Sequence, residues 1–266
     1  MGNSNSVSLV IDILDLAGFM LASGLLVMGF RTSNASRLWS RLGHLMFIVG
    51  TLAATTHALL QGTTTTMLAA TIGWATIISW FVWQIELVGA FTSPVIAIIL
   101  MSGIFFTTNS SQPLAGHHEF GMRVHVAAAI LGQAFAILAC GMSLLLLWLD
   151  KKLKNKQLAE LPVKFPGINT LNNALYATLW AGFIFITISL LTGSLYAVSG
   201  LMPNQASMLG KVTWAILVWL WYLSILVLKG LMGYRPQKVA RMSLVGFLIL
   251  AVSWFGLITW MPWGQP

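Results

Sequence analysis

The sequence predicts an all-α membrane protein, a polytopic transmembrane helix bundle of about eight spans. Of its 266 residues, 58% are hydrophobic and only 8% are charged, and the mean hydropathy is +0.85. A soluble domain cannot bury that much apolar surface. Long apolar runs recur along the chain, and about 20 apolar residues suffice to cross a hydrocarbon core ~30 Å thick. The basic residues lie mainly between these runs, as in multi-pass membrane proteins.

The boundaries of the spans follow from the charges and from the lengths of the apolar runs. Residues 126–149 carry no charge and predict a central span that begins beside His125. Residues 67–106 are too many for one crossing, so we predict a break near Gln84 and Glu86. Residues 150–173 form a hydrophilic connector. The predicted spans cover approximately residues 8–30, 42–61, 67–84, 86–106, 126–149, 175–198, 211–228 and 242–260.

The basic residues predict an orientation with both termini outside the cytoplasm. Lys and Arg near a span are retained on the cytoplasmic side. With an outer N-terminus, only Arg123 and Lys211 fall outside. We therefore interpret the net charge of +8 as an orientation signal, and we expect no nucleic-acid partner. The cytoplasmic set is Arg31, Arg37, Arg41, Lys151, Lys152, Lys154, Lys156, Lys164, Lys229, Arg235, Lys238 and Arg241.

The chain shows no internal repeat and no separate soluble segment, so we expect one transmembrane domain over residues 1–266. Its single cysteine, Cys140, lies inside a predicted span. One cysteine excludes an internal disulfide and any CxxC thiol or zinc site. The lipid bilayer is the partner that the composition predicts.

Two histidines, His57 and His125, lie near the outer ends of different predicted spans. Each shares a helical face with small residues, which is how membrane helices approach one another closely. Two imidazoles at similar depth could hold a heme iron axially between apolar helices. The alternative is that each ring only hydrogen-bonds a carbonyl or a polar neighbour. The small residues are Gly50, Ala53 and Ala54 beside His57, and Ala128, Ala129, Gly132 and Ala136 beside His125.

The other three histidines are weaker candidates. His117 and His118 are adjacent, so on a helix they would point about 100° apart, and we interpret them as a solvated loop pair. His44 lies near the predicted cytoplasmic end of its span, about 20 Å from His57 at the helical rise per residue. We interpret His44 as an interfacial or packing residue.

The acidic residues do not form a catalytic arrangement. Asp12 and Asp15 share one helical face near the outer end of the first span. They could pair with Arg123 or Lys211, or be half of a proton or cation path, and we favour structural pairing. The sequence offers no nucleophile with a positioned base, no Walker-type loop and no carboxylate pair, so we do not expect an enzyme.

Five stretches occur in an order and spacing typical of one known family. They are THALL at 56–60, RVHVAAAILGQAFAILA from 123, WLDKKLKNKQL from 148, LLTGSLYA from 190 and WAILVWLWYLSILVLKGLMGYRPQKVA from 214. Together they resemble the integral-membrane cytochrome c assembly superfamily, and particularly its YpjD-like group, which is related to CcsA and HemX proteins. The resemblance implies a multi-pass protein of the bacterial inner membrane with heme as cofactor. His125 matches the family's external histidine and His57 the upstream one, and membrane or cytochrome-assembly proteins are the implied partners.

The sequence departs from the synthase-type members of that family in three places. The tryptophan-rich WGxxWxWDPKE segment is replaced by SGLMPNQASMLGK at 199–211. Leu228 and Lys229 replace a Leu-His pair, and the final WMPWGQP lacks the C-terminal histidine. The resemblance therefore implies heme binding or handling through His57 and His125, for transfer, sensing or assembly support rather than bond formation. The alternative is a HemX-like regulatory or scaffold protein without heme. A small-solute transporter is a weaker alternative because no inverted repeat is apparent.

Overall fold

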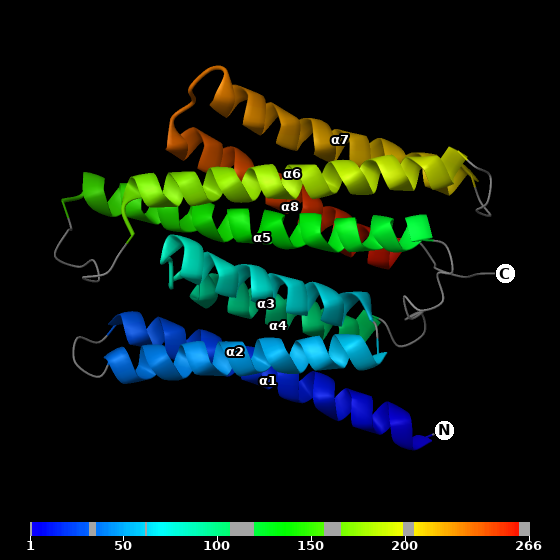
Figure 1. Cartoon of the computed structure of the whole chain (residues 1–266), viewed down its shortest axis with the longest axis horizontal. Helices are drawn as coiled ribbons and strands as arrows, with labels where there is room; N and C mark the ends of the chain where they lie inside the picture. Colours follow the sequence, from blue (N-terminus) through cyan, green and yellow to red (C-terminus); the bar gives the residue numbers. More distant parts are fainter. Residues whose placement is uncertain are drawn as a thin grey trace. The chain divides into compact units, whose positions relative to one another are not determined.

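The computed structural model describes residues 2–31, 36–61, 63–106, 120–156, 166–198 and 205–260 (Figure 1). Over these residues the chain forms eight helices and no strand, which confirms the all-α prediction. The helices are α1 (Gly2–Arg31), α2 (Ser36–Gln61), α3 (Thr64–Trp83), α4 (Val88–Phe106), α5 (Phe120–Lys154), α6 (Ile168–Val198), α7 (Gln205–Gly230) and α8 (Pro236–Trp260).

The helices have the length and surface of membrane-spanning segments. Large apolar side chains point outward, for example Phe81 on α3 and Leu195 on α6, which are 76% and 71% exposed. An outward apolar surface of this kind is stable against lipid, so the chain is a polytopic membrane protein. Five described segments are long and apolar enough to cross a bilayer: Leu38–Leu60, Thr64–Trp83, Phe120–Lys154, Ile168–Leu195 and Gly210–Gly230, with shorter apolar segments at Ile13–Gly29 and Val88–Ile104.

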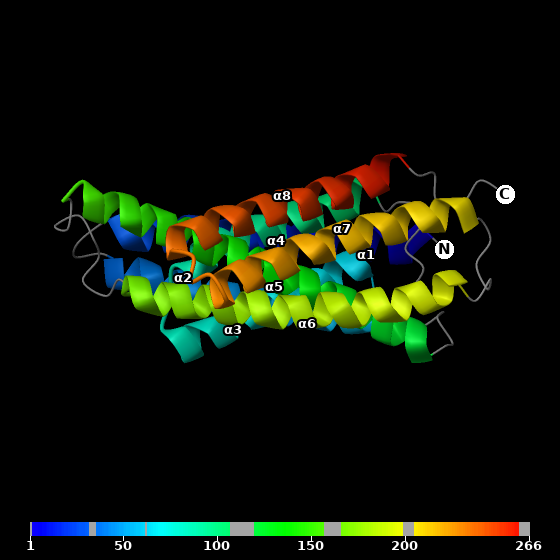
Figure 2. The same ribbon diagram turned by 90° about the horizontal axis from the view of Figure 1, so that it is seen from above.

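The helix contacts divide the chain into two compact units. In the first unit, α1 packs against α2 and α4, and α3 packs against the same two helices. In the second unit, α5 packs against α6 and α8, and α7 packs against the same two helices. Figure 2 shows α6, α7 and α8 running alongside one another. The single domain over residues 1–266 stays a prediction.

Helices α1 and α2 approach each other through glycines. A Cβ atom on Gly29 would lie 2.9 Å from the backbone of Ser40, and one on Gly43 would lie 2.9 Å from the backbone nitrogen of Leu26. Small residues let membrane helices pack closely enough for their backbones to touch. Deeper in the interface the rings of Phe19 and Phe47 meet edge to face, 5.6 Å apart.

We expect Gly43→Ala to destabilise the first unit relative to Gly18→Ala. The new methyl group would overlap Leu26, and overpacking of a tight interface costs about 1–3 kcal/mol. Gly18 is a matched control, because a Cβ there meets nothing within 4 Å. Thermal unfolding of the detergent-purified variants measures the difference. Equal melting temperatures would contradict the close α1–α2 contact.

The predicted break between the third and fourth spans is confirmed. Helix α3 ends at Trp83, and Gln84 adopts a left-handed conformation with φ = 54° while its N–H donates to the carbonyl of Trp80. At the start of α3, the hydroxyl of Thr63 accepts a hydrogen bond from the N–H of Thr66 and so caps the helix. Helix α4 continues through Pro94.

The hydrophilic connector predicted over residues 150–173 is shorter in the structure. Helix α5 continues to Lys154, and α6 begins at Ile168. The first two turns of α6 bury Leu171 and Ala174 completely, and such apolar packing stabilises a helix whose sequence looks polar. Likewise α7 begins at Gln205, six residues before the predicted span over residues 211–228.

Candidate functional site

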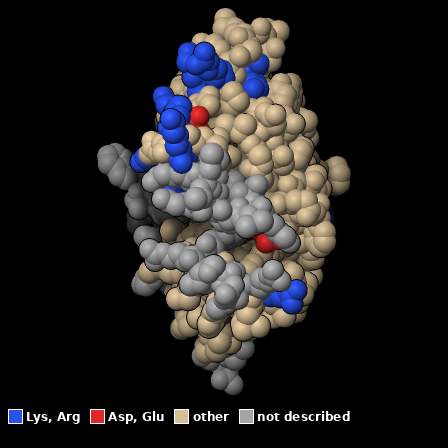
Figure 3. Space-filling view, turned by 90° about the vertical axis from the view of Figure 1, so that its left-hand side faces the viewer, with Lys and Arg blue, Asp and Glu red and all other residues tan. Residues whose placement is uncertain are grey.

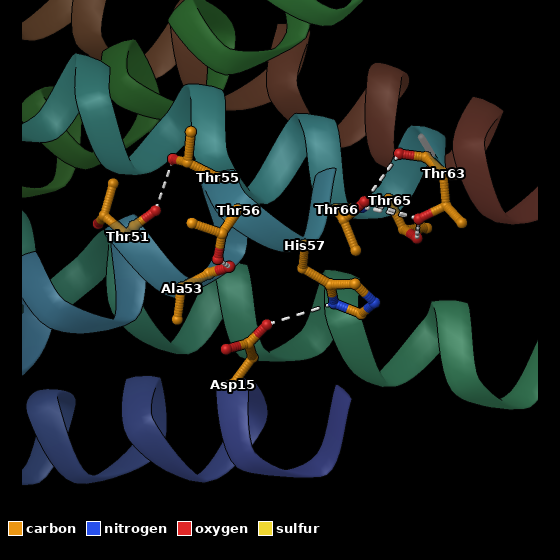
Figure 4. Close-up of polar contacts among 9 residues, drawn as sticks. All are labelled: Asp15, Thr51, Ala53, Thr55, Thr56, His57, Thr63, Thr65 and Thr66. Carbon is orange, nitrogen blue, oxygen red and sulfur yellow. Dashed lines mark hydrogen bonds and ion pairs between the residues drawn. The ribbon is translucent and has the colours of Figure 1, made fainter. Parts of the chain in front are cut away.

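His57 lies on α2 and faces the Asp15 carboxylate of α1 (Figure 4). The Nδ1 atom of His57 is 3.5 Å from the Oδ2 atom of Asp15, and the two side chains are only 2% and 4% exposed. The facing surface of α2 is made of small residues, as predicted: Ala54 is fully buried, and a Cβ on Gly50 would lie 3.4 Å from the ring of Phe19. The pair is therefore enclosed by protein.

A buried carboxylate beside an imidazole orients that imidazole. The contact between Asp15 and Nδ1 favours the tautomer with its hydrogen on Nδ1, which leaves the Nε2 lone pair available as a ligand. Carboxylate–histidine pairs of this kind orient many metal-binding histidines. The same contact also pairs two polar side chains inside an apolar bundle, so both predicted interpretations of His57 are compatible with it.

His125 lies on α5, and its Nδ1 atom is 2.8 Å from the backbone carbonyl oxygen of Ser189 on α6. A carbonyl oxygen can only accept, so Nδ1 carries the hydrogen and donates it. In the neutral ring the lone pair is then on Nε2. The hydroxyl oxygens of Ser189 and Thr192 lie 3.3 and 3.5 Å from Nδ1 and complete a polar cradle.

Gly193 makes room for the His125 ring. A Cβ at this position would lie 2.6 Å from Cε1 and 2.8 Å from Nδ1 of His125, closer than real Cβ atoms come. The LLTGSLYA stretch thus contributes Thr192 and Gly193 to the surroundings of His125. The predicted small-residue face of α5 is also found, since Ala128 and Ala136 are almost fully buried.

The two candidate histidines belong to different units. His57 is placed by α1 and α2, whereas His125 is placed by α5 and α6. Their joint binding of one iron stays a prediction. Within the described ranges, no group of three or more His, Cys, Asp or Glu residues lies close enough together to hold a metal ion.

His44 has the packing role that we predicted for it. Its Nδ1 donates to the carbonyl of Ser40 at 2.6 Å, and its ring stacks edge to face on Trp80 with 4.6 Å between centroids. Its Nε2 lies 3.9 Å from the Oε2 atom of Glu86. His117 and His118 lie outside the described residues.

Asp15 has a partner that we did not predict. The sequence suggested Arg123 or Lys211 as possible partners, and the structure places Asp15 against His57. Arg123 and Lys211 belong to the second unit, and Asp15 to the first. The side chain of Asp12 lies outside the described part of the structure. The sequence did indicate that Asp15 needs a polar partner, because a carboxylate inside a mostly apolar span is costly without one. It did not indicate which residue the partner is.

The aromatic residues of α7 act in helix packing. The indole of Trp219 donates to the hydroxyl of Thr187 on α6 at 2.8 Å, and the indole of Trp221 donates to the carbonyl of Met242 on α8 at 3.1 Å. The ring of Tyr222 is buried. These contacts hold α7 against α6 and α8.

Comparisons with known proteins agree with the resemblance inferred from the sequence. The chain matches the family model described as Cytochrome C assembly protein over residues 39–262. It is 30% identical to the inner membrane protein YpjD of Escherichia coli K12 over 138 residues, which are 51% of this chain and 50% of the relative. It is 31% identical over 137 residues to the cytochrome c biogenesis protein CcsA of Chlamydomonas reinhardtii, covering 51% and 37% of the two chains.

A third relative is the cytochrome c biogenesis protein CcsA of Prochlorococcus marinus NATL1A, which is 28% identical over 116 residues, 42% of this chain and 35% of the relative. The chain thus spans between about a third and a half of the length of these curated relatives. No solved structure matches the chain.

Proposed function

Since the chain belongs to the cytochrome c assembly protein family, we propose that it acts in cytochrome c biogenesis as a heme-handling, multi-pass protein of a bacterial inner membrane. His57 and His125 are the axial ligands of one heme iron near the outer face. The protein transfers, senses or supports delivery of heme and forms no covalent bond itself. Other membrane or cytochrome-assembly proteins are its partners.

The observation that carries this proposal is the hydrogen bond from Nδ1 of His125 to the carbonyl of Ser189. Metal-bound histidines commonly donate their second ring nitrogen to a carbonyl or carboxylate, which fixes the ring and makes the binding nitrogen more basic. His57 has the carboxylate version of this arrangement in Asp15. Each histidine therefore has a neighbour that orients its ring, which fits a role as an axial heme ligand.

The chemistry supplied by the heme would be reversible redox change at its iron, tuned by the axial ligands and by the surrounding polarity. The chain's own residues would bind the heme iron and hold its two histidine ligands in a fixed orientation. Ser189 orients the ring of His125 and Asp15 orients the ring of His57, which is the more deeply buried of the two.

Heme titration of the detergent-purified protein tests the proposal. We expect the wild type to take up heme with a low-spin spectrum, and we expect His57→Ala and His125→Ala each to weaken binding by on the order of tenfold or more. His44→Ala is the matched control, because His44 contacts Ser40 and Trp80 in the same unit as His57. Equal binding by all three variants would contradict the assignment of the ligands.

A second candidate function, a HemX-like regulatory or scaffold protein without heme, is favoured by the burial of His57. Its side chain is 2% exposed and already contacts Asp15. A scaffold protein should take up no heme, and its support of cytochrome c maturation in cells should survive His57→Ala and His125→Ala. Pull-down of partner proteins would then identify what it stabilises.

A further inference from the structure

One end of the second unit is strongly basic. This end comprises the last turn of α5, the last turn of α7 and the start of α8, and Figure 3 shows blue Lys and Arg side chains gathered there. Asp150 is the acidic residue among the described side chains of this end, and it accepts hydrogen bonds from Lys154 and Gln237. The basic residues are Lys151, Lys152, Lys154, Lys156, Lys229, Arg235, Lys238 and Arg241.

The turn between α7 and α8 forms an open hollow of about 380 Å³ within this basic end. Its lining residues are Met232, Gly233, Tyr234, Arg235 and Lys238. The hollow thus combines a guanidinium and an ammonium group with an aromatic ring. Guanidinium and ammonium groups are the side chains that bind phosphate groups best.

The turn that carries the hollow is held by backbone geometry. Gly233 has φ = +59°, which glycine adopts without strain, and the N–H of Tyr234 donates to the carbonyl of Leu228 at 3.3 Å. The ammonium group of Lys238 lies 4.9 Å from the centre of the Tyr234 ring. This cation–π contact holds the ammonium group beside the hollow.

Two exposed apolar side chains adjoin the hollow. Leu231 and Met232 are 84% and 66% exposed, and they directly follow the membrane-spanning segment Gly210–Gly230. Residues just beyond a span lie at the level of the lipid headgroups. Apolar groups beside basic groups at this depth match an amphiphile, whereas a free phosphate would use only the basic groups.

We propose that this hollow binds the headgroup of an anionic phospholipid of the cytoplasmic leaflet. Arg235 and Lys238 pair with the lipid phosphate, and Leu231 and Met232 contact the upper part of its acyl chains. Clusters of Lys and Arg next to a span attract anionic lipids of that leaflet. Basic residues that only set the orientation of the protein in the membrane need positive charge and no hollow. The hollow is therefore evidence for a binding site in addition to that role. It is independent of the proposed heme function.

Thermal unfolding in lipid mixtures tests the proposal. The purified protein is measured in nanodiscs of phosphatidylcholine with increasing phosphatidylglycerol. We expect phosphatidylglycerol to raise the melting temperature of the wild type, because a ligand of the folded state stabilises it. Arg235→Gln combined with Lys238→Gln should weaken the apparent affinity by on the order of tenfold or more. The control variant, Lys151→Gln combined with Lys156→Gln, removes two positive charges that lie outside the hollow. It should change the apparent affinity for phosphatidylglycerol much less.

Two further measurements distinguish a lipid headgroup from free phosphate as the ligand and provide a variant that should still fold. Inorganic phosphate and glycerol phosphate, added to the protein in phosphatidylcholine alone, should not reproduce the shift at matched concentration. Leu231→Ser with Met232→Ser, both at exposed positions, should weaken the response to the lipid without loss of charge. Equal losses in the two charge variants, no shift in the wild type, or an equal shift with free phosphate would overturn the proposal.

Discussion

Asp15→Ala is expected to lower the free energy of unfolding by about 3 kcal/mol or more. The reason is that Asp15 and His57 are both almost fully buried, with 3.5 Å between Oδ2 and Nδ1. Truncating one partner leaves the other polar group in an apolar interior, and for buried pairs this is far more costly than the net value of the pair. Denaturant or thermal unfolding of the purified protein gives the change.

A double-mutant cycle decides whether the two residues act as a pair. The combined Asp15→Ala and His57→Ala variant should be less destabilised than the sum of the two single changes. Lys154→Ala is the control, since its exposed i,i+4 pair with Asp150 is worth only about 0.3–0.5 kcal/mol. Additive effects of Asp15→Ala and His57→Ala would contradict the coupling.

Gly193→Ala is expected to displace the imidazole of His125. The added methyl group would lie 2.6 Å from Cε1 of the ring, so the ring must move and its hydrogen bond to the Ser189 carbonyl must weaken or break. Loss of such an orienting contact reduces metal affinity by about 10- to 100-fold in known sites. Heme titration of the variant measures the loss of affinity. This prediction rests on the proposed function.

Gly210→Ala is the matched control for Gly193→Ala. It makes the same chemical change in the same unit, and a Cβ at Gly210 meets nothing within 4 Å. Both changes also share the small gain in helix propensity of alanine over glycine. If heme affinity is the same in the two variants, then the His125 ring does not depend on its contact with Gly193.

The helical fold could be predicted from the sequence because apolar run length and charge placement act locally. The break near Gln84 is an example, since a mostly apolar run of forty residues is too long for one crossing and its only charge, Glu86, lies beside the break. The first two turns of α6 could not be predicted, because the burial of Leu171 depends on tertiary contacts and its neighbours in the sequence are polar.

The candidate histidines could be located from their spacing, but their partners could not. Small residues beside His57 and His125 correctly indicated faces that look into a bundle. The partners Asp15 and Ser189 lie on other helices, 42 and 64 positions away along the chain. Gly193 is one of many glycines in the sequence. Only the packing of α5 against α6 shows that it leaves space for the imidazole ring of His125.

The visible absorption spectrum of the wild-type protein, purified in detergent and recorded oxidised and reduced, tests the central claim most directly. Heme handling through His57 and His125 predicts a low-spin, six-coordinate spectrum that is lost in His57→Ala and in His125→Ala while both variants remain folded. A wild type that is colourless and stays colourless after heme is added would contradict heme binding, and the chain would then act as a scaffold.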